Sequence, residues 1–431
     1  MIGQLIFAII LIAALGLATF NARKIIRNIR LGRAEDRSDQ PSRRWKTMLL
    51  VAFGQKKMFK RPFPALLHLF VYLGFIIINI EMLEIVIDGL FGTHRVFVGL
   101  GPAYNFLIGA FEWLALSVLL ACVVFLTRRN IARLRRFSGT EMKKWPRTDA
   151  NFILIAEILL MSAFLLMNAA DFKLQGMGHY VSAGAFPVSG WLVGMLPNNV
   201  DSLVMIERSA WWFHIIGVLA FLNYLPYSKH LHILLAFPNT YFTRLRPQGE
   251  FTNMDSVTNE VKAMMDPSYT PVEAESSLRF GAKDVQDLTW LNLLDAYTCT
   301  ECGRCTSVCP ANITGKLLSP RKIMMDTRDR MVEVGKNIDR NKGSFEDDGK
   351  SLLDDYISRE EIWACTTCNA CVEACPVNIN PLEIIVELRR YAVMEESQAP
   401  ASLNAMFGNI ENNGAPWKYA QADRANWRDA N

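Results

Sequence analysis

The stretch Cys299-Thr-Glu-Cys302-Gly-Arg-Cys305-Thr-Ser-Val-Cys309-Pro310 is matched in spacing by Cys365-Thr-Thr-Cys368-Asn-Ala-Cys371-Val-Glu-Ala-Cys375-Pro376. Together the two runs hold eight of the nine cysteines in this chain of 431 residues, and each reads C-x2-C-x2-C-x3-C-P. Four thiols so close in sequence can converge on one small inorganic group. A structural zinc site usually takes its ligands as two separated pairs instead. The runs therefore predict a domain that binds metal clusters.

The spacing is typical of proteins with two [4Fe–4S] clusters, in which the fourth cysteine of each run ligates the other cluster. Three thiolates on one tight loop can bind three iron corners of a cubane. The crossed ligand sets that we predict are, for cluster I, Cys299, Cys302, Cys305 and Cys375, and, for cluster II, Cys365, Cys368, Cys371 and Cys309. Crossing keeps the clusters close enough for rapid electron transfer. Structural disulfides are disfavoured in a reducing cytoplasm.

The residues around the runs predict a helical iron–sulfur domain over 286–397. Segment 310–364 is longer than in compact ferredoxins, and its apolar residues are interspersed with many charges, which favours helices over strands. We expect a solvated, charged insert near 336–350. Residues 236–285 are more polar, with Pro, Ser, Thr and acidic residues, and are interpreted as a linker.

Charge divides the chain into two unlike halves. Residues 1–235 carry 25 Lys and Arg against 13 Asp and Glu, whereas the remaining residues carry 21 against 29. The whole chain is 51% hydrophobic and 20% charged, compared with about 25% charged residues in an average soluble protein. This composition excludes a disordered chain, a collagen and a nucleic-acid binder with a spread basic face.

The first half predicts five membrane spans, over about 2–20, 63–87, 101–127, 151–170 and 209–226. Each has about the 17–25 residues that cross a bilayer core. The first span is followed, not preceded, by Arg23, Lys24 and Arg27. A cleavable signal peptide carries its positive charges before the apolar run, so we expect an uncleaved anchor whose N-terminus lies outside.

The connecting loops predict the orientation. Residues 21–63 hold 13 basic residues and 128–149 hold eight, whereas 88–100 and 171–208 hold only Arg95, Lys173 and Arg208. Basic loops stay in the cytoplasm. We therefore expect a multi-pass protein of the inner (plasma) membrane, with its C-terminal half in the cytoplasm.

Ionisable residues in the spans are candidate functional groups, because they are costly at membrane depth. Imidazole ligates haem iron, although an isolated histidine is more simply explained by a hydrogen bond to a carbonyl. If the fifth helix is continuous, His214 and His232 lie on one face about 27 Å apart, with His230 about 160° away; Pro226 would kink this helix.

The span carboxylates either line a quinone or proton path or pair within the bundle: Glu81, Glu84, Glu112 and Glu157. Cys122 is interpreted as a small packing residue.

The stretch from His214 to His232, with its Pro226-Tyr-Ser228-Lys229 corner, resembles the last helix of the respiratory nitrate reductase gamma-subunit family. That family consists of five-helix, di-haem b membrane proteins that exchange electrons with quinol, and it includes membrane subunits of heterodisulfide reductase-like complexes. The resemblance implies a cytochrome b domain over 1–235, in which His68 and His232 bind a cytoplasmic-side haem and His214 an outer one.

The sequence departs from this family at Ile78, where the second helix normally supplies another histidine. An outer haem would need another partner, and Met82, His94 and His179 are the candidates. Met82 lies only about 40° from the helical face of His68. We therefore expect one haem b and leave the second open.

Further motifs surround the cysteine runs: Arg279-Phe280-Gly281, Asp287-Leu-Thr-Trp290, Leu293-Leu294-Asp295, Thr314-Gly315-Lys316-Leu-Leu-Ser319-Pro320-Arg321 and Glu361-Ile-Trp363-Ala-Cys365. Over about 279–390 they resemble the iron–sulfur part of the heterodisulfide reductase C subunits. The tail near 406–417 resembles the linker that precedes a CCG domain in fused relatives, although no CCG motif occurs in this sequence. The resemblance implies that residues 398–431 dock a CCG-type catalytic subunit, fed by an electron-transfer flavoprotein or a flavin dehydrogenase.

These observations predict an all-α protein, with a five-helix transmembrane haem-binding bundle followed by a helical di-cluster ferredoxin domain. The expected function is electron transfer between membrane quinone, haem b, two [4Fe–4S] clusters and a cytoplasmic partner. Neither a nucleotide-binding glycine-rich loop nor a Ser/His/Asp arrangement is found, so no catalytic residue is assigned and substrate chemistry is expected on the partner. The alternatives are a redox sensor without turnover and a membrane-anchored ferredoxin scaffold.

Overall fold

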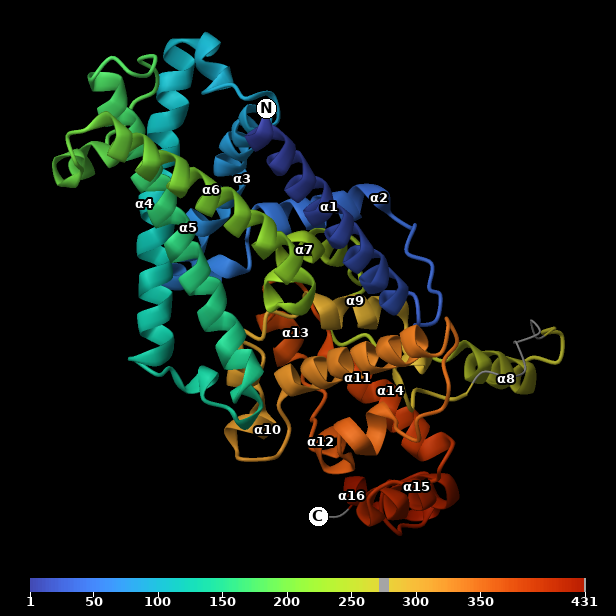
Figure 1. Ribbon diagram of the computed structural model, residues 1–431. Helices are drawn as coiled ribbons and strands as arrows, with labels where there is room; N and C mark the ends of the chain where they lie inside the picture. The colour runs from blue at the N-terminus through green and yellow to red at the C-terminus, as the bar shows by residue number, and fades with distance from the viewer. Residues whose placement is uncertain (271–278, 430–431) are drawn as a thin grey trace.

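A computed structural model describes residues 1–270 and 279–429, and its helices fall into two halves (Figure 1). Five long helices form a bundle, and shorter helices surround the cysteine runs. The regular structure of the described residues is helical, and their only β-pairings are two isolated bridges, between Arg33 and Thr289 and between Leu353 and Ile357. The predicted all-α class, with five apolar helices ahead of the cysteine-rich region, is confirmed.

The bundle helices cover the five predicted spans. They are α1 (Ile2–Ile29), α3 (Pro62–Phe91), α4 (Pro102–Asn130), α5 (Trp145–Gly176) and α6 (Val200–Tyr224). Each of these five described helices is long and apolar enough to cross a membrane. A helix of 28 residues, such as α1, is about 42 Å long, which exceeds a hydrocarbon core of about 30 Å. Most of the helices therefore extend beyond the predicted spans, because their polar ends continue the helix past the apolar stretch.

Helix α5 packs between α4 and α6, and α1 packs on α3 and α6. The shared core includes buried Phe7, Phe111, Phe164 and Ile215, and Cys122 is buried among them. Many other large apolar side chains of the bundle are exposed, among them Ile2, Leu5, Ile9, Phe75, Leu83, Phe106 and Leu120. An apolar outer surface is what a helical bundle presents to lipid.

The fifth span does not continue to His232 as one helix. Helix α6 ends at Tyr224, two 3₁₀ turns follow over Leu225–Tyr227 and Lys229–Leu231, and α7 (His232–Tyr241) starts anew. The prediction that His214 and His232 share one helical face was therefore wrong.

Local chemistry explains this break. Pro226 has no backbone N–H with which to continue the helix, and Ser228 is extended, with φ −119° and ψ 150°. Asp149 of α5, which is 2% exposed, accepts hydrogen bonds from Ser228 Oγ at 2.7 Å and from the Lys229 N–H at 3.1 Å. These bonds fix the chain in a corner rather than a helix.

The iron–sulfur half consists of short helices around one apolar core. Its helices are α9 (Trp290–Thr298), α10 (Pro310–Ile313), α11 (Pro320–Arg340), α12 (Arg359–Trp363), α13 (Ala370–Ala374) and α14 (Pro381–Met394). Helix α11 packs on α9 and α14. The predicted solvated insert near 336–350 begins inside α11, and its Asp348 pairs with the fully buried Arg330 at 2.7 Å. This part of the insert is therefore tied to the core.

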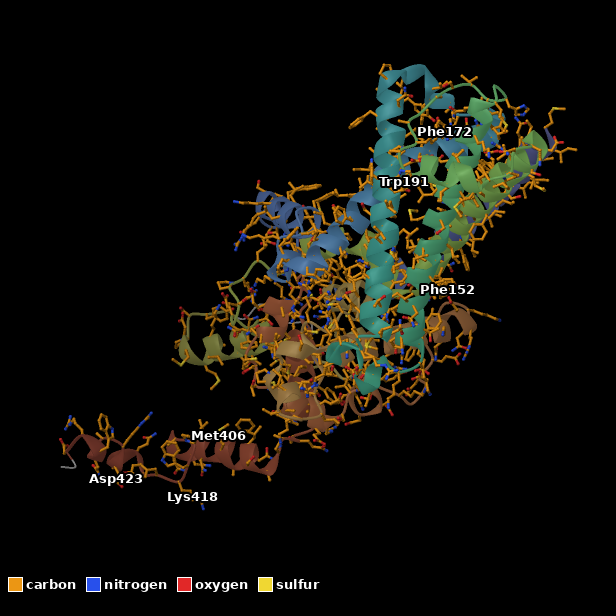
Figure 2. All side chains as sticks on the ribbon, turned by 90° about the vertical axis from the view of Figure 1, so that its left-hand side faces the viewer. Phe152, Phe172, Trp191, Met406, Lys418 and Asp423 are labelled. Atoms are coloured by element: carbon orange, nitrogen blue, oxygen red, sulfur yellow. The ribbon has the colours of Figure 1, made fainter. Side chains whose placement is uncertain are left out.

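Four helices lie outside the two cores: α2 (Pro41–Met48), α8 (Asp255–Met265), α15 (Ala401–Asn413) and α16 (Asn426–Asp429). The segment interpreted as a linker is partly packed, because buried Asn239 of α7 donates to the Val377 carbonyl at 3.0 Å; its residues 271–278 lie outside the described part. Figure 2 shows the tail that carries Met406, Lys418 and Asp423 extending away from the other helices.

Ionic contacts join the halves at the end of the bundle that carries the basic loops. Lys24 and Arg27 of α1 pair with Asp339 of α11. Lys60, in the loop before α3, pairs with Glu373 of the second cysteine run. Positive groups of the membrane half therefore meet negative groups of the iron–sulfur half, as the uneven charge along the sequence would favour.

Candidate iron–sulfur and haem sites

The first predicted cluster site lies where the two cysteine runs meet. One small cavity is lined by all four predicted ligands of cluster I, which are Cys299, Cys302, Cys305 and Cys375, and Cys371 also borders it. The loop turns tightly because Glu301 and Gly303 have positive φ angles of 54° and 69°. A Cβ atom at Gly303 would lie 2.5 Å from Nη1 of Arg321 and 3.0 Å from the Arg136 carbonyl oxygen, so the close packing and the positive φ both favour glycine there.

The second predicted ligand set also comes together across the runs. Cys309 precedes α10, Cys371 lies in α13, and Cys365 and Cys368 lie on the loop before α13. Burial, together with the neighbouring thiolates of Cys365, Cys309 and Cys368, raises the pKa of Cys371 to about 12. Thiolates affect one another in this way only when they are close. The first predicted set therefore lines one cavity, and in the second set Cys371 lies near Cys365, Cys309 and Cys368.

The donor chemistry fits thiolate-bound iron. Burial raises the pKa of Cys299 and of Cys375 to about 12, so these thiols stay protonated at neutral pH unless a cation compensates the thiolate. Iron provides such compensation, and metal binding then releases the protons. Among the residues that the structure describes, no group of three or more His, Cys, Asp or Glu side chains could hold a single metal ion.

Backbone N–H groups donate hydrogen bonds to the sulfur atoms of two predicted ligands, which affects the reduction potential of a bound cluster. The Ile379 N–H donates to Cys375 Sγ at 3.3 Å, and the Thr367 N–H donates to Cys365 Sγ at 3.4 Å. Arg389 donates to the Cys365 carbonyl. Hydrogen bonds to the sulfurs, net charge and solvent exposure set the reduction potential of an iron–sulfur cluster.

His68 of α3 and His232 of α7 form a facing pair. Their ring centres are 6.4 Å apart, and the ring planes are inclined by 43°. The Nδ1 atom of His68 lies 3.1 Å from Oε1 of Gln55, and Nδ1 of His232 lies 3.0 Å from the Lys229 carbonyl oxygen. Each ring therefore donates through Nδ1, and its Nε2 has no hydrogen-bond partner in the described part of the chain. Metal–imidazole bonds are about 2 Å long, so rings at this separation could together hold one metal ion.

His230 lies beside this pair rather than on a distant face. Its ring centre is 5.6 Å from that of His232 and 5.2 Å from that of Phe221, with both pairs close to edge-on. Burial lowers the pKa of His230 to about 3, and it also lowers the pKa of His232. Both rings are therefore neutral at physiological pH.

His214 is buried in the bundle, and its Nδ1 lies 3.0 Å from the Leu160 carbonyl oxygen. Its Nε2 is therefore available to a ligand. Two of the three predicted outer partners make contacts elsewhere. His94 pairs with Asp171 at 3.4 Å, and the ring centre of His179 is 5.3 Å from that of Tyr180.

A cavity of about 380 Å³ lies between the start of α1, the end of α3 and the part of α6 around Trp211. It combines aromatic and ionisable side chains, among them Phe7, Trp211, Trp212, Glu81, Glu84, His94, Asp171 and Arg208. Glu81 is 3% exposed, and its Oε2 has no hydrogen-bond partner within the described residues. Glu112 lies outside the cavity lining and accepts hydrogen bonds from the N–H groups of Val188 and Ser189, as a structural group would.

The structure reveals site residues that the sequence analysis missed. Gln55 orients His68, Asp149 fixes the corner before His232, and Arg304 lies between two predicted cluster ligands. Gln55 and Asp149 lie 13 and 80 residues from the groups that they hold. Only the position of Arg304 within the first cysteine run was a usable sequence signal.

Comparisons with known proteins agree with the iron–sulfur half. Residues 298–379 match the family described as a 4Fe-4S dicluster domain. The chain is 30% identical over 456 residues to the probable iron-sulfur-binding oxidoreductase FadF of Bacillus subtilis, with 99% of this chain and 61% of the relative covered. It is 28% identical over 424 residues to the EtfAB:quinone oxidoreductase of Syntrophomonas wolfei, with 91% and 55% covered. The chain therefore spans less than two thirds of these relatives.

A third relative matches only part of the chain. It is the C subunit of the ferredoxin/F(420)H(2)-dependent CoB-CoM heterodisulfide reductase of Methanosarcina acetivorans, which is 36% identical over 108 residues, or 25% of this chain and 52% of the relative. No solved structure matches the chain. The likeness of the membrane half to nitrate reductase gamma subunits stays a prediction. The chain thus contains a 4Fe-4S dicluster domain, together with five helices able to cross a membrane, and is homologous to iron–sulfur oxidoreductases and heterodisulfide reductase C subunits.

Proposed function

We propose that this chain is a membrane-bound electron-transfer subunit of an oxidoreductase complex. Electrons would pass between the quinone pool, haem b, two [4Fe–4S] clusters and a cytoplasmic partner. The observation that carries the proposal is the succession of sites in one molecule. Gln55 contacts His68 of the histidine pair, and two residues later the Lys57 carbonyl accepts a hydrogen bond from Arg304, which lines the first cysteine site.

The cysteine residues would hold the clusters so that electrons move between them without a mobile carrier. Cys375 of the second run reaches the first cavity, and Cys309 of the first run reaches the second site. Each run therefore contributes to both sites and fixes their separation. The N–H groups that donate to Cys365 and Cys375 stabilise the additional negative charge of a reduced cluster.

His68 and His232 would hold haem b, which gains and loses single electrons when bound. These two neutral imidazoles would suit the group to electron transfer rather than to oxygen binding. Gln55 and the Lys229 carbonyl fix the ring orientations and keep the proton of each ring on Nδ1, as hydrogen-bond partners of metal-bound histidines commonly do. His214, whose Nε2 is also free, would hold an outer haem if the chain binds two.

The cavity at the far end of the bundle would receive the quinone headgroup. Its tryptophan side chains can pack against a flat ring, and the unpaired Oε2 of Glu81 can accept a proton when quinol is oxidised. Trp211 lies about one helical turn from His214 on α6. The similarity to an EtfAB:quinone oxidoreductase supports a quinone as the membrane substrate.

Substrate chemistry would belong to a partner protein. We propose a CCG-type heterodisulfide reductase-like subunit, an electron-transfer flavoprotein or a flavin dehydrogenase, in keeping with the names of the relatives. Residues 398–431 would form its docking segment, because no residue of α15 is buried and Phe407 and Ile410 are exposed. The other domains would be the cytochrome b domain over 1–235, the linker over 236–285 and the ferredoxin-like domain over 286–397.

The iron–sulfur half would lie in the cytoplasm beneath the inner (plasma) membrane. The bundle end that carries the basic loops is also the end that pairs with the iron–sulfur half. Basic loops face the cytoplasm in membrane proteins generally.

Spectroscopy of the purified protein tests the proposal against its alternatives. A redox sensor or a membrane-anchored ferredoxin scaffold requires clusters but neither haem nor a reaction with quinol. We expect a b-type reduced-minus-oxidised spectrum, a pyridine haemochrome assay that gives at least one haem per chain, and cluster reduction by quinol. Protein that contains both clusters but has no haem and does not react with quinol contradicts the proposal.

The cluster assignment has its own test. Anaerobically purified protein should contain about eight non-haem iron atoms and as many labile sulfides. Replacing Cys302 with Ala should abolish the electron paramagnetic resonance signal of one cluster. Cys122→Ala, which changes a cysteine buried in the bundle, should retain both signals. Stoichiometric zinc without labile sulfide would contradict the assignment.

A further inference from the structure

One short loop contacts both the histidine pair and the cluster I site. The bridging loop, residues 54–61, leads into α3. At its start, Gln55 is 4% exposed, and its Oε1 lies 3.1 Å from Nδ1 of His68. Two residues later, the carbonyl of Lys57 accepts a hydrogen bond from Nη1 of Arg304 at 3.2 Å. Arg304 also donates to the Met58 carbonyl, from Nη2, at 3.4 Å.

The same loop also contacts the cysteine runs at other points. Arg61 donates to Ser307 Oγ at 3.0 Å in the first run. In the second run, Lys57 Nζ donates to the Val372 carbonyl at 3.4 Å, and Lys60 pairs with the next residue along the run. The bridging loop is therefore held to both cysteine runs, while its first residues hold the His68 ring.

Arg304 is a buried cation next to the predicted ligands of cluster I. It is 5% exposed, lies between Cys302 and Cys305 in sequence, and lines the cavity of the four cluster I cysteines. Its hydrogen-bond acceptors within the described residues are backbone carbonyls, and none of those residues forms a carboxylate ion pair with it. A buried guanidinium without a counter-charge is costly.

The cysteine thiolates supply that counter-charge. Arg304 follows Cys302 by two residues and lines the cavity that Cys302 and Cys375 also line. Its bond to the Lys57 carbonyl attaches it to the loop whose Gln55 holds the His68 ring. The guanidinium therefore lies beside predicted ligands of cluster I and is connected to His68 through the bridging loop.

We propose that Arg304 has two roles. It sets the reduction potential of cluster I (the tuning role) and, through its bonds to the bridging loop, it fixes the position of that cluster relative to His68 (the register role). One electron entering the cluster adds one negative charge, and a buried cation stabilises the reduced form without any proton transfer. Net charge is one of the terms that set iron–sulfur potentials. The tuning role requires only the iron–sulfur site, whereas the register role rests on the proposed function.

Arg389 offers a matched control. It donates to the carbonyls of Ile362 and Cys365, and Cys365 is a predicted cluster II ligand. Arg304 and Arg389 therefore place one cation each beside different clusters. Removing the two charges separately should affect two different redox transitions.

The test is redox potentiometry of the full-length protein with chemical mediators and dithionite, read by electron paramagnetic resonance. Arg304→Gln should lower the midpoint of one cluster by at least the equivalent of a tenfold change in the ratio of reduced to oxidised forms, which is about 59 mV for one electron. Arg389→Gln should lower the midpoint of the other cluster. Arg304→Lys, which keeps the charge, should retain most of the native value. Iron and labile sulfide contents are measured for each variant.

Three results would overturn the tuning role. The first is an unchanged midpoint potential in Arg304→Gln with both clusters present. The second is a change in the midpoint of the same cluster in both Arg304→Gln and Arg389→Gln. The third is a midpoint shift in Arg304→Lys as large as that in Arg304→Gln. If Arg304→Gln fails to retain cluster I, the lysine variant decides, because a native midpoint there supports the role of charge and a lowered midpoint rejects it.

The register role is tested by the b-type spectrum and the rate of electron transfer from the haem to cluster I. Gln55→Ala should shift the spectrum while leaving both cluster midpoints unchanged, because Gln55 touches His68 and not the cysteines. Lysine cannot reproduce the planar set of bonds that Arg304 makes to the loop. Arg304→Lys should therefore slow electron transfer from the haem to cluster I while the midpoint of cluster I stays native. A native transfer rate in this variant overturns the register role. Absence of haem would reject the proposed function and the register role, while the potentials would still decide the tuning role.

Discussion

The imidazole of His232 combines a fixed orientation with a free Nε2, since its Nδ1 is committed to the Lys229 carbonyl at 3.0 Å. Replacing His232 with Ala should therefore abolish the b-type signal of the cytoplasmic-side haem and the reduction of the clusters by quinol. The cysteine ligands should still assemble their iron. His230→Ala should have a much smaller effect, because that ring packs edge-on against Phe221. Visible spectra and non-haem iron content of the two variants provide the measurement.

The two variants make a stringent pair because the His230 and His232 rings lie only 5.6 Å apart. A general disturbance of this corner would affect both variants equally. Loss of haem in His230→Ala and its retention in His232→Ala would reverse the ligand assignment. It would also contradict the resemblance that suggested His232.

Whether a site residue could be predicted from the sequence depends on how far along the chain its partner lies. The cysteine sets could be predicted because cluster ligation constrains spacing within an eleven-residue run. The partners of His68 could not be predicted, because Gln55 reaches that ring only through a loop with a φ of 49° at Gln55 itself. Arg304 was visible within a cysteine run, but its contacts with the Lys57 and Met58 carbonyls depend on how the two halves pack.

The corner between α6 and α7 yields a prediction about an element rather than a ligand. Buried Asp149 accepts hydrogen bonds from the Tyr224 hydroxyl at 2.5 Å, from Ser228 Oγ at 2.7 Å and from the Lys229 N–H at 3.1 Å. Asp149→Ala leaves these donors without their acceptor and should destabilise the protein by about 3–5 kcal/mol, as loss of one member of a buried charged network does. Thermal unfolding in detergent measures the effect.

The Asp149→Asn variant separates geometry from charge. Its amide oxygen can still accept from Ser228, so we expect a smaller loss of about 1–3 kcal/mol. Haem content should follow the same order, because Lys229 orients the His232 ring. Equal stability and haem content in the native protein and Asp149→Ala would show that the corner does not depend on this carboxylate.

The helices themselves differed in how well they could be predicted. The five spans were evident from long apolar runs, because a bilayer imposes a minimum length on any helix that crosses it. The break after Tyr224 was not evident, because proline in a membrane helix is compatible with either a kink or a stop. The outcome here depends on Asp149, which comes from another helix.

For the whole molecule, the ion pairs between the halves predict a dependence on pH. Lys24 and Arg27 hold the pKa of Asp339 below its ordinary value, and Lys60 with Gln248 does the same for Glu373. A carboxyl group whose folded pKa is lowered stabilises the folded state above its ordinary pKa of about 4, and it loses that contribution as the pH falls through the lowered value. Packing of the halves should therefore weaken as the pH falls below about 4.

A variant carrying Asp339→Asn and Glu373→Gln provides the comparison, since its pairs are absent at every pH. Its susceptibility to proteolysis between the halves should exceed that of the native protein at pH 7, and the difference should shrink below about pH 4. High salt at pH 7 should also reduce the difference, because the pairs are partly exposed. A difference independent of both pH and salt would show that these ion pairs do not join the halves.

Topology is the prediction that the remaining inferences on electron flow require. Lys60 and Glu373 bring the basic loop before α3 and the second cysteine run into contact, so these segments must lie on one side of the membrane. Reporter fusions placed after Arg129 and at the C-terminal end should both report cytoplasm, whereas one within 175–200 should report the outside. This pattern requires α5 and α6, which separate the three reporter positions, each to cross the membrane. A C-terminal reporter active only outside would separate the clusters from any cytoplasmic partner, whereas an inside signal within 175–200 would show that α5 does not cross.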